Sequence, residues 1–594
     1  MATAVSRGSS FDTLPYEVKI RIFSRLPFCE RVRLTRVSQS WRQFLLNWPE
    51  MFERIENRCD CAFERDLSYT MCQLNHALLP YAPYIQPKAF RDLSLLMLSD
   101  NTANQKNMIL ENTFDFFIAL RFYYIEKCFI SITCLDEEWF SKFIKVCSHN
   151  LKRLEFMMRP DTPIDVPFLD LFLLRLTHLE DFRLLAFPAS GDDGHLFAGL
   201  FLNHFDGVSD SIPENWSVKT IELDCHGSAI YMPLDTFVTK LRGLQFARIK
   251  PADFRDPLTV GQAFAQCPNL RLLIVDKDSA HNWSQHKKEG AKGLYHLELT
   301  DQFCKPAIYL PLLTKHHQTL ETLKLDGLVL TRGTMRALAP LEFPALKKIV
   351  IKDKTLFEQG DEDEDHGVFA SGDDFDTFIH RLPPQLEYLH LSVYSYLTDG
   401  MLRALESVAC LKKLELVVCN GITEEGLLHF LNHTQSKDTL EELILTGQHC
   451  VTNDVLHTIG RNLSALTYLS LTSRNNVSLF DGLDRFLDTS PIIGKLHYLA
   501  IDCNKDDDFV PTNEQVEDVL HKLQAKVSIW HFCLDAPSKK RRRLRGVDFW
   551  FKHYAPRTKE SGQESSEESS DEYSHEYSQE DSEDDDNESN GSEH

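Results

Sequence analysis

The chain has 594 residues, of which 43% are hydrophobic and 26% are charged, and its formal net charge is −24. This is ordinary globular composition, and the length allows several domains or one long repeat array. The acidic excess argues against nucleic acid as a main partner, since phosphate binding requires basic surface, and no apolar stretch is long enough to predict a membrane span.

The N-terminus lacks an apolar segment of the kind found in secretory signals. We therefore expect the 15 cysteines to be reduced and the protein to lie in the nucleus and/or the cytoplasm.

The first predicted elements are two or three short helices within residues 11–52. Val18, Ile22 and Leu26 recur at helical spacing, and Pro27 then interrupts the pattern. A unit this small buries little core alone and usually needs a partner or a neighbouring domain.

The same segment contains L-P-x-E, I-F-x-x-L and V-x-x-x-W-R, beginning at Leu14, Ile22 and Val37. With these motifs it resembles the F-box family. The resemblance implies a small all-helical domain that docks onto a Skp-type adaptor and thereby joins a cullin–RING ubiquitin ligase. It also implies the adaptor-binding residues Leu14, Pro15, Glu17, Ile22, Phe23, Leu26, Val37 and Trp41.

The alternative is that these helices only cap the end of the repeats that follow. A cap would bury its apolar side chains within the chain, whereas an F-box leaves an apolar patch for a partner.

Residues 53–120 are expected to form a linker followed by irregular first repeats. FRDLSL from Phe90 is a weak repeat copy here, and IEKCFI from Ile125 is another just beyond it. Cys59 and Cys61 have no second pair at a zinc-like spacing, which favours free thiols.

Residues 121–535 return repeatedly to the pattern L-x-x-L-x-L. The copies begin at Leu151, Leu179, Val218, Leu244, Leu270, Leu294, Leu320, Leu346, Leu386, Leu411, Leu440, Leu466 and Leu496. Ten of the twelve intervals between these starts lie between 24 and 30 residues. The two longer intervals indicate insertions around 191–207 and 361–376.

Alternating apolar residues predict a short strand with one buried face, and the next 15–20 residues must return the chain for a parallel strand. Thr398, Thr423 and Thr452 are plausible helix N-caps in these returns, and Thr512 with Gln515 fits a capping box. Stacked units can bury the face that a single unit cannot. We therefore predict an α/β fold, a curved solenoid of about 13–15 repeats with strands on the concave side and helices on the convex side.

The run from Leu411 to Leu431, LKKLELVVCNGITEEGLLHFL, resembles leucine-rich repeats of the 26-residue, cysteine-containing type, with Cys419 at the buried turn position. Such repeats bind many unrelated partners, so the resemblance specifies a fold rather than a function.

The concave face is the predicted site for a protein substrate. In L-x-x-L-x-L the leucines point inward, so the third, fifth and seventh positions should be exposed. The candidate substrate-binding residues are Tyr388, His390, Lys413, Glu415, Tyr468 and Tyr498. Tyr388, Tyr468 and Tyr498 share the third position and would stack in a row, either as anchors for a partner or as packing for one another.

Residues 536–559 are expected to form a basic segment and a C-terminal cap. Its KKRRRLR run predicts a nuclear-import signal, with a nucleic-acid patch or a solvated loop as alternatives. The import candidates are Lys539, Lys540, Arg541, Arg542, Arg543 and Arg545.

Residues 560–594 contain 15 acidic residues and no Lys or Arg, and they should be disordered. Acidic residues three positions downstream make Ser565, Ser569, Ser578 and Ser582 candidates for phosphorylation. This acidic tail could bind basic nuclear proteins, fold over the basic run or simply keep the chain soluble.

No phosphate-cradling G-x-x-x-x-G-K, no H-E-x-x-H and no paired Cys/His spacing is recognised, so we predict no catalytic residues, no metal and no cofactor. The two resemblances together imply a non-catalytic substrate-recognition subunit of an SCF ubiquitin ligase, which brings a protein substrate close to the ligase. The alternative is an acidic-tailed leucine-rich-repeat nuclear scaffold or histone-binding chaperone without a ligase role. An F-box protein acting outside ubiquitination also remains open.

Overall fold

The structure is a computed structural model. It describes residues 13–26, 28–52, 54–56, 91–95, 103–132, 137–158, 176–186, 214, 217–225, 238–250, 257–276, 283–300, 303–328, 332–353, 372–392, 397–417, 421–448, 450–473, 480–503, 513–534 and 551–554. Apart from Tyr554 these residues belong to one compact unit, Met1–His553.

The N-terminal segment folds as short helices, as its spacing predicts. They are α1 (Tyr16–Phe23), α2 (Phe28–Leu34), α3 (Gln39–Asn47) and the 3-10 helix η2 (Pro49–Phe52). Pro15 occupies the N-cap of α1. Ser38 caps α3, because its Oγ accepts a hydrogen bond from the Trp41 N–H at 3.0 Å.

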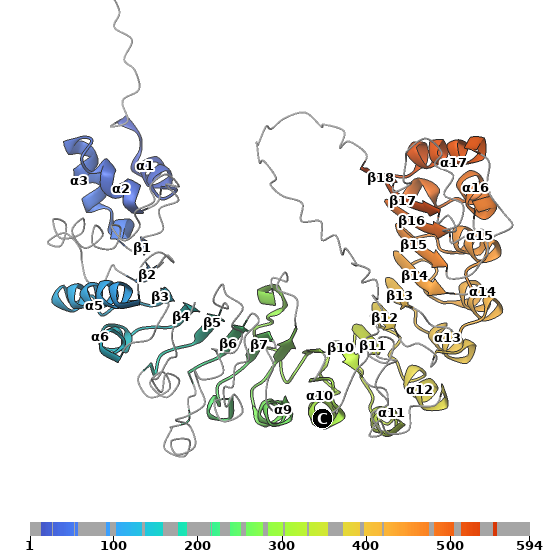
Figure 1. Ribbon diagram of the computed structural model, residues 1–594, viewed down its shortest axis with the longest axis horizontal. Helices are drawn as coiled ribbons and strands as arrows, with labels where there is room; N and C mark the ends of the chain where they lie inside the picture. The colour runs from blue at the N-terminus through green and yellow to red at the C-terminus, as the bar shows by residue number, and fades with distance from the viewer. Residues whose placement is uncertain are drawn as a thin grey trace, which may run out of the picture. The chain divides into compact units, whose positions relative to one another are not determined.

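The strands of the chain build one open sheet (Figure 1). They are β1 (Arg54–Glu56), β2 (Asp92–Leu95), β3 (Lys127–Ile132), β4 (Arg153–Met158), β5 (Asp181–Ala186), β6 (Thr220–Cys225), β7 (Phe246–Lys250), β8 (Leu272–Val275), β9 (His296–Thr300), β10 (Thr322–Leu328), β11 (Lys348–Asp353), β12 (Tyr388–Ser392), β13 (Lys413–Val417), β14 (Glu442–Gln448), β15 (Tyr468–Ser473), β16 (Tyr498–Cys503), β17 (Ile529–Leu534) and β18 (Phe551–Tyr554). Each strand from β1 to β16 pairs in parallel with the next strand of the sequence.

Helices connect many of these strands, and the α-helices lie on one side of the sheet (Figure 1). They are α5 (Ala103–Ala119), α6 (Glu137–Cys147), α9 (Pro257–Gln266), η7 (Trp283–His286), α10 (Pro306–His316), α11 (Arg332–Leu338), α12 (Gly372–Ile379), α13 (Asp399–Leu405), α14 (Glu424–His433), α15 (Asn453–Asn462), α16 (Phe480–Thr489), η10 (Ile493–Lys495) and α17 (Asn513–Lys526). Among the described helices, none has the length and apolar character needed to cross a membrane.

The repeat pattern correctly predicts the strands. Each of the thirteen pattern copies forms or leads into one strand from β4 to β16. FRDLSL contains β2, and IEKCFI leads into β3. Leu386, Leu389 and Leu391 show the underlying packing, since all three are 0% exposed. The sequence pattern does not predict β1, because its three residues lie in the segment expected to be a linker.

Threonine caps fix the start of two return helices. The side chain of Thr423 accepts from the Gly426 N–H, and that of Thr452 accepts from the Val455 N–H. Thr398 holds the N-cap position of α13 but makes no side-chain capping bond. The predictions for Thr512 and Cys419 lie outside the described residues.

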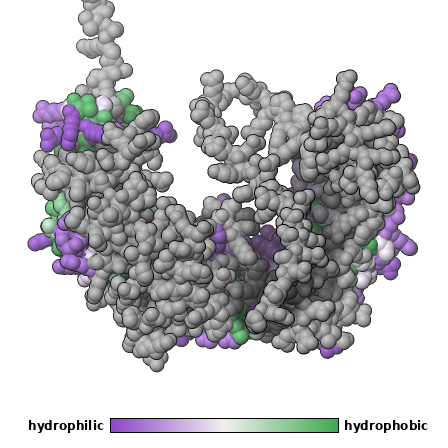
Figure 2. All heavy atoms as spheres, viewed as in Figure 1, coloured by the Kyte–Doolittle hydropathy of each residue, from purple (hydrophilic) through white to green (hydrophobic). Residues whose placement is uncertain are grey.

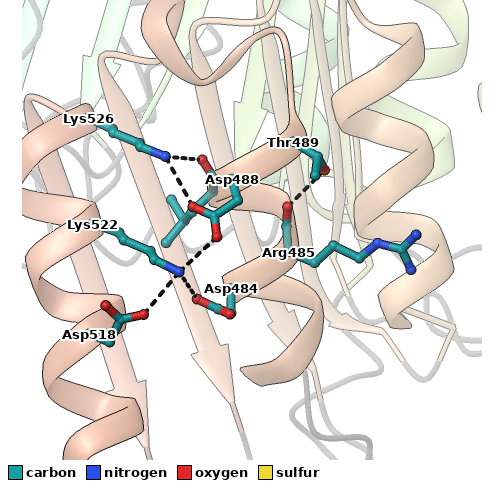
Figure 3. Close-up of polar contacts among 8 residues, drawn as sticks. Asp484, Arg485, Asp488, Thr489, Asp518, Lys522 and Lys526 are labelled. Carbon is teal, nitrogen blue, oxygen red and sulfur yellow. Dashed lines mark hydrogen bonds and ion pairs between the residues drawn. The ribbon is translucent and has the colours of Figure 1, made fainter.

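A lysine joins the last two helices of the repeats (Figure 3). Lys522 Nζ on α17 lies 2.6 Å from Asp484 Oδ1 and 2.8 Å from Asp488 Oδ2, both on α16, and 3.0 Å from Asp518 Oδ2 on its own helix. Lys526 adds a second contact to Asp488 at 3.3 Å. These bonds raise the pKa of Lys522 above its usual range. We call this arrangement a lysine clip.

An equivalent clip joins α5 and α6 near the other end of the repeats. Lys142 Nζ on α6 lies 2.6 Å from Glu111 Oε1 and 2.8 Å from Asp115 Oδ2 on α5, with Glu138 one turn away on its own helix at 3.9 Å. In both clips the first helix supplies two carboxylates four residues apart, and the second supplies the lysine.

Candidate functional site

The N-terminal helices pack around an aromatic core. Phe23 is 1% exposed, and its ring centroid lies 5.5 Å from those of Trp41 and Phe44. Leu45 of α3 and Trp48, the residue that follows this helix, are also buried. Phe23 therefore lies beneath the outer surface of these helices, and its own side chain is not accessible to a partner.

Apolar side chains also remain on the outside of these helices. Within the described residues, the large apolar side chains that are exposed are Tyr16, Val18, Ile22, Val37 and Tyr124, and the first four belong to this segment. We call Tyr16, Val18, Ile22 and Val37 the F-box surface. Figure 2 shows hydrophobic atoms beside hydrophilic ones on these helices.

Helical spacing explains part of this surface. Val18 and Ile22 lie one turn apart on α1, and with Arg21 and Arg25 they line an open depression. Ile22 is 42% exposed and Val37 is 61% exposed, although burial would stabilise both. A helical cap would have buried these side chains, so the exposure favours a docking surface.

The predicted adaptor contacts differ in how exposed their side chains are. Ile22, Val37, Pro15 and Glu17 are exposed, Leu14, Leu26 and Trp41 are partly buried, and Phe23 is buried. Tyr16 and Val18 are exposed too, but they are not among the adaptor contacts predicted from the sequence. The four-residue spacing from Val18 to Ile22 is the signal that identifies Val18.

The strand face is the side of the sheet opposite the helices, where alternate strand residues point. Over β4 to β7 it carries a row of alternating charges that are adjacent in register. The Arg183 guanidinium lies 3.1 Å from Glu155 Oε1, through Nη1, and 3.1 Å from Glu222 Oε2, through Nε. Arg248 Nη1 lies 2.8 Å from Glu222 Oε1. Opposite charges directly across strands stabilise a sheet, and they leave little net charge here for a partner.

The connection between β8 and β9 covers the next part of the strand face. Its 3-10 helix η7 contributes Trp283, which is 6% exposed, to a separate apolar cluster. The buried members of that cluster are Phe246, Leu272, Ile274, Trp283 and Tyr295. Lys287 Nζ lies 4.3 Å from the Trp283 ring centroid, and burial lowers the pKa of Lys287. The strand face is thus closed over β7 to β9, which the repeat pattern does not predict.

Tyr388 is the centre of a charged network on β11 to β13. Lys348 and Lys413 place their Nζ atoms 4.8 Å and 5.3 Å from its ring centroid. The Tyr388 hydroxyl donates to Glu415 Oε2 at 3.2 Å, and His390 Nδ1 lies 2.9 Å from the same oxygen. Burial alone would raise the pKa of Glu415, but the bond from His390 holds it below its usual value.

The prediction that His390 is exposed is wrong, because the side chain is closed in by its neighbours. It is 7% exposed and stands in register between Val350, which is 5% exposed, and Glu415. The other candidate residues of the strand face, Tyr388, Lys413, Glu415, Tyr468 and Tyr498, are partly buried.

The tyrosines of the third repeat position do not form one continuous row. Tyr468 and Tyr498 stack with centroids 4.2 Å apart and planes 6° apart. Burial, together with Tyr498, raises the pKa of Tyr468 to about 12. Lys413 and Glu442, paired at 2.8 Å, separate this stack from Tyr388 in the register.

Further candidates lie outside the described residues. These are the import residues Lys539, Lys540, Arg541, Arg542, Arg543 and Arg545 and the phosphorylation candidates Ser565, Ser569, Ser578 and Ser582.

One group of metal-type ligands does occur in the described part of the chain, namely Glu406, His429 and His433. The spacing of the two histidines, H-x-x-x-H on α14, is a paired spacing that the sequence search overlooks.

One domain family and several solved structures show similarity to parts of the chain. The F-box domain family matches residues 11–50, and no curated protein matches the chain. A structure of the yeast Rad7 and Elc1 complex is similar at 17% identity, covers 50% of this chain and 79% of that chain, and has a TM-score of 0.30. A TLR13–ssRNA13 complex is similar at 16% identity, with 63% and 48% covered and a TM-score of 0.33. LegL7 from Legionella pneumophila, a leucine-rich-repeat protein, is similar at 12% identity, with 47% and 91% covered and a TM-score of 0.24.

At such low identities and TM-scores, these structures say nothing about what this chain binds. The repeat assignment therefore depends on the chain's own geometry, with leucines buried at fixed positions of consecutive parallel strands. The chain carries an F-box domain at residues 11–50, followed by a leucine-rich-repeat solenoid.

Proposed function

We propose that this protein is the substrate-recognition subunit of an SCF ubiquitin ligase. Its F-box docks a Skp-type adaptor, and the adaptor connects it to a cullin–RING ligase. The repeats bind a protein substrate, and the chain itself performs no chemistry. Ubiquitination is then promoted by proximity, since holding two reactants together raises their effective concentration.

The observation that carries the proposal is the F-box surface. Four large apolar side chains are exposed on an F-box domain, and two of them, Val18 and Ile22, lie together one turn apart on α1. Exposed apolar side chains that lie together are typical of docking sites. The aromatic core below, built on Phe23 and Trp41, gives that surface a fixed shape.

Co-purification tests the adaptor contact. We would express the full chain and an Ile22→Asp/Val37→Asp variant in cells and quantify the Skp-type adaptor and the cullin recovered with each. Both positions are exposed, so the charges should leave the fold intact while making the docking surface polar. We expect adaptor and cullin to be lost together from the variant.

Tyr124→Asp is the matched control, because Tyr124 is an exposed apolar residue outside the F-box. It should retain the adaptor. If the wild-type chain recovers no adaptor, the receptor function is contradicted and the nuclear scaffold becomes the better proposal. If the double variant keeps the adaptor, docking does not depend on Ile22 and Val37, and the F-box surface is contradicted as the contact.

For the substrate, the open part of the strand face on β12 to β16 is the proposed contact. It presents the Tyr468–Tyr498 stack together with Lys413 and Glu415, whereas β7 to β9 are covered. Planar aromatic pairs give large contact area at low entropic cost, which suits a protein-binding face.

For localisation, we propose the nucleus and/or the cytoplasm, with residues 539–545 as the import signal. The acidic tail would attract basic nuclear proteins by charge. A fluorescent fusion in which these basic residues are changed to Gln should stay cytoplasmic if the run directs import.

A further inference from the structure

Two histidines and a glutamate meet on the helix side of the repeats, away from the F-box and the strand face. His429 and His433 lie one turn apart on α14, and Glu406 is the C-cap residue of α13. One candidate ligand atom from each of the three side chains lies within 4.8 Å of the other two. Imidazole and carboxylate together are ligands that zinc accepts.

Hydrogen bonds hold both imidazole rings in the same tautomer. His429 Nδ1 lies 2.7 Å from Glu406 Oε1, and His433 Nδ1 lies 2.8 Å from the His429 carbonyl oxygen. Both partners are acceptors, so each Nδ1 carries a proton and each Nε2 of a neutral ring keeps its lone pair. An imidazole in this state is ready to bind a metal through Nε2.

The arrangement around Glu406 resembles the outer shell of a zinc site. In such sites a carboxylate commonly accepts the second N–H of a ligating histidine and fixes the orientation of the ring. The two histidine rings stack face to face, with centroids 4.1 Å apart and planes 23° apart, so both lie on the same part of the helix surface.

The backbone keeps these parts in place. The Glu406 carbonyl accepts from the Gln435 N–H at 2.9 Å, which ties α13 to the segment after α14. The Thr423 cap fixes the other end of α14. A site whose supports are already ordered loses less entropy when an ion binds.

We propose that Glu406, His429 and His433 form a surface site for Zn²⁺. His429 and His433 turn out of their stack to bind the ion through Nε2, Glu406 orients His429 through its Nδ1–H, and water completes the coordination shell. The site is independent of the proposed function, because it involves neither the F-box nor the strand face.

Carbethoxylation of histidine, mapped by mass spectrometry, tests the site in the full chain. This readout reports each histidine separately, which matters because the chain has 24 histidines and 15 cysteines that could bind zinc elsewhere. The reduced protein would be labelled with diethylpyrocarbonate with and without micromolar free Zn²⁺. We expect Zn²⁺ to slow the labelling of both His429 and His433 in the wild-type chain.

Variants then separate the roles of the three residues. His433→Gln should abolish the protection of His429, since one imidazole holds zinc poorly. Glu406→Gln should weaken zinc binding by about 10- to 100-fold, the usual effect of losing an outer-shell carboxylate. Without zinc, both variants should melt close to the wild-type temperature, because the side chains of all three residues are at least partly exposed.

His380 is the matched control. Its Nδ1 lies 3.0 Å from Asp376 Oδ1, four residues earlier on α12, so it has a carboxylate partner like that of His429. It belongs to no candidate metal-ligand group in the described part of the chain. His380→Gln should leave the protection of His429 and His433 unchanged. Equal labelling of these two residues with and without Zn²⁺ in the wild-type chain would overturn the site, and wild-type protection in Glu406→Gln would overturn the role of Glu406.

Discussion

At the scale of single residues, Gly426 is required by a contact between neighbouring repeats. Asp399 accepts hydrogen bonds from the N–H and the hydroxyl of Thr423, at 2.8 and 2.6 Å. Thr423 in turn caps α14. A Cβ at Gly426 would overlap the Asp399 carboxylate, so a side chain here would displace the group that links the two repeats.

Gly426→Ala is therefore expected to lower the free energy of unfolding by about 2 kcal/mol, as overpacking commonly does. Gly400→Ala is the control on the preceding helix, because its Cβ would lie 3.5 Å from the Thr398 hydroxyl and meet no clash. That substitution should be neutral or stabilise by up to about 1 kcal/mol. Urea unfolding midpoints of both variants check the prediction, and equal shifts in the two would contradict it.

Arg121 occupies a backbone conformation that normally selects glycine. Its φ is 58°, and it follows the C-terminal turn of α5. The Phe122 N–H donates to the Phe117 carbonyl at 2.9 Å, and the Arg121 N–H donates to the Ile118 carbonyl at 3.1 Å. The rings of Phe117 and Phe122 lie 5.7 Å apart. These features define a Schellman motif with Arg121 at its left-handed position.

Arg121→Gly should raise the free energy of unfolding by about 1 kcal/mol, because it removes the steric cost of a Cβ in the left-handed region. Arg121→Ala keeps that Cβ and should give no such gain. Thermal melting of the two variants side by side measures the difference. A glycine variant no more stable than the alanine variant would show that Arg121 is not strained.

At the scale of elements, the lysine clip couples α17 to α16. Lys522 holds the pKa of Asp488 below its usual value, with help from Lys526. A carboxyl group whose pKa is lower in the folded state adds stability above its unfolded pKa. That stability is lost as the pH falls through the folded value. Acid should therefore loosen the contact between the two helices.

Lys522→Met should destabilise α17 at neutral pH, since it leaves Asp484, Asp488 and Asp518 close together without the lysine. Lowering the pH should then relieve the repulsion, so the variant should lose less stability than the wild type on acidification. Amide hydrogen exchange in α17 between neutral and acidic pH measures both effects. Parallel pH profiles in the two proteins would contradict the clip.

The repeat sequence predicts the strands well because their signal is local. A fixed leucine spacing defines which face of each strand is buried, as Leu411, Leu414 and Leu416 show with 0% exposure. The cover over β7 to β9 is not predictable in this way. It depends on Trp283 packing onto Phe246 and Leu272, which come from different repeats and look like ordinary outward positions in the sequence.

The candidate site residues also differ in whether local sequence or packing between repeats determines their exposure. Ile22 and Val37 follow from the F-box motifs, and both are exposed. The burial of His390 depends on its neighbours in adjacent strands, which repeat spacing alone does not specify. The approach of Glu406 to α14 likewise arises from the packing of successive return helices.

At the scale of the whole molecule, charge is unevenly distributed. Residues 11–50 contain seven Lys or Arg and four Asp or Glu, a net charge of +3, whereas the whole chain carries −24. Arg21 and Arg25 border the apolar Val18 and Ile22. A basic domain on an acidic chain favours an acidic docking partner and disfavours association of the F-box with a basic one.

We therefore expect the Skp-type adaptor to present acidic groups to the F-box, and its association rate to fall as salt is added. Arg21→Gln/Arg25→Gln should slow association several-fold at low ionic strength and much less at high ionic strength. The dissociation rate should change less, because long-range charge acts mainly on the encounter of the two proteins. Lys292→Gln/Lys305→Gln removes the same charge at exposed positions outside the F-box and should have little effect. Stopped-flow binding of the purified full chain to the adaptor over a range of salt measures these rates. If association is insensitive to salt, or if the control pair slows it equally, the attraction does not come from the basic F-box, and the apolar contacts of Ile22 and Val37 must account for docking alone.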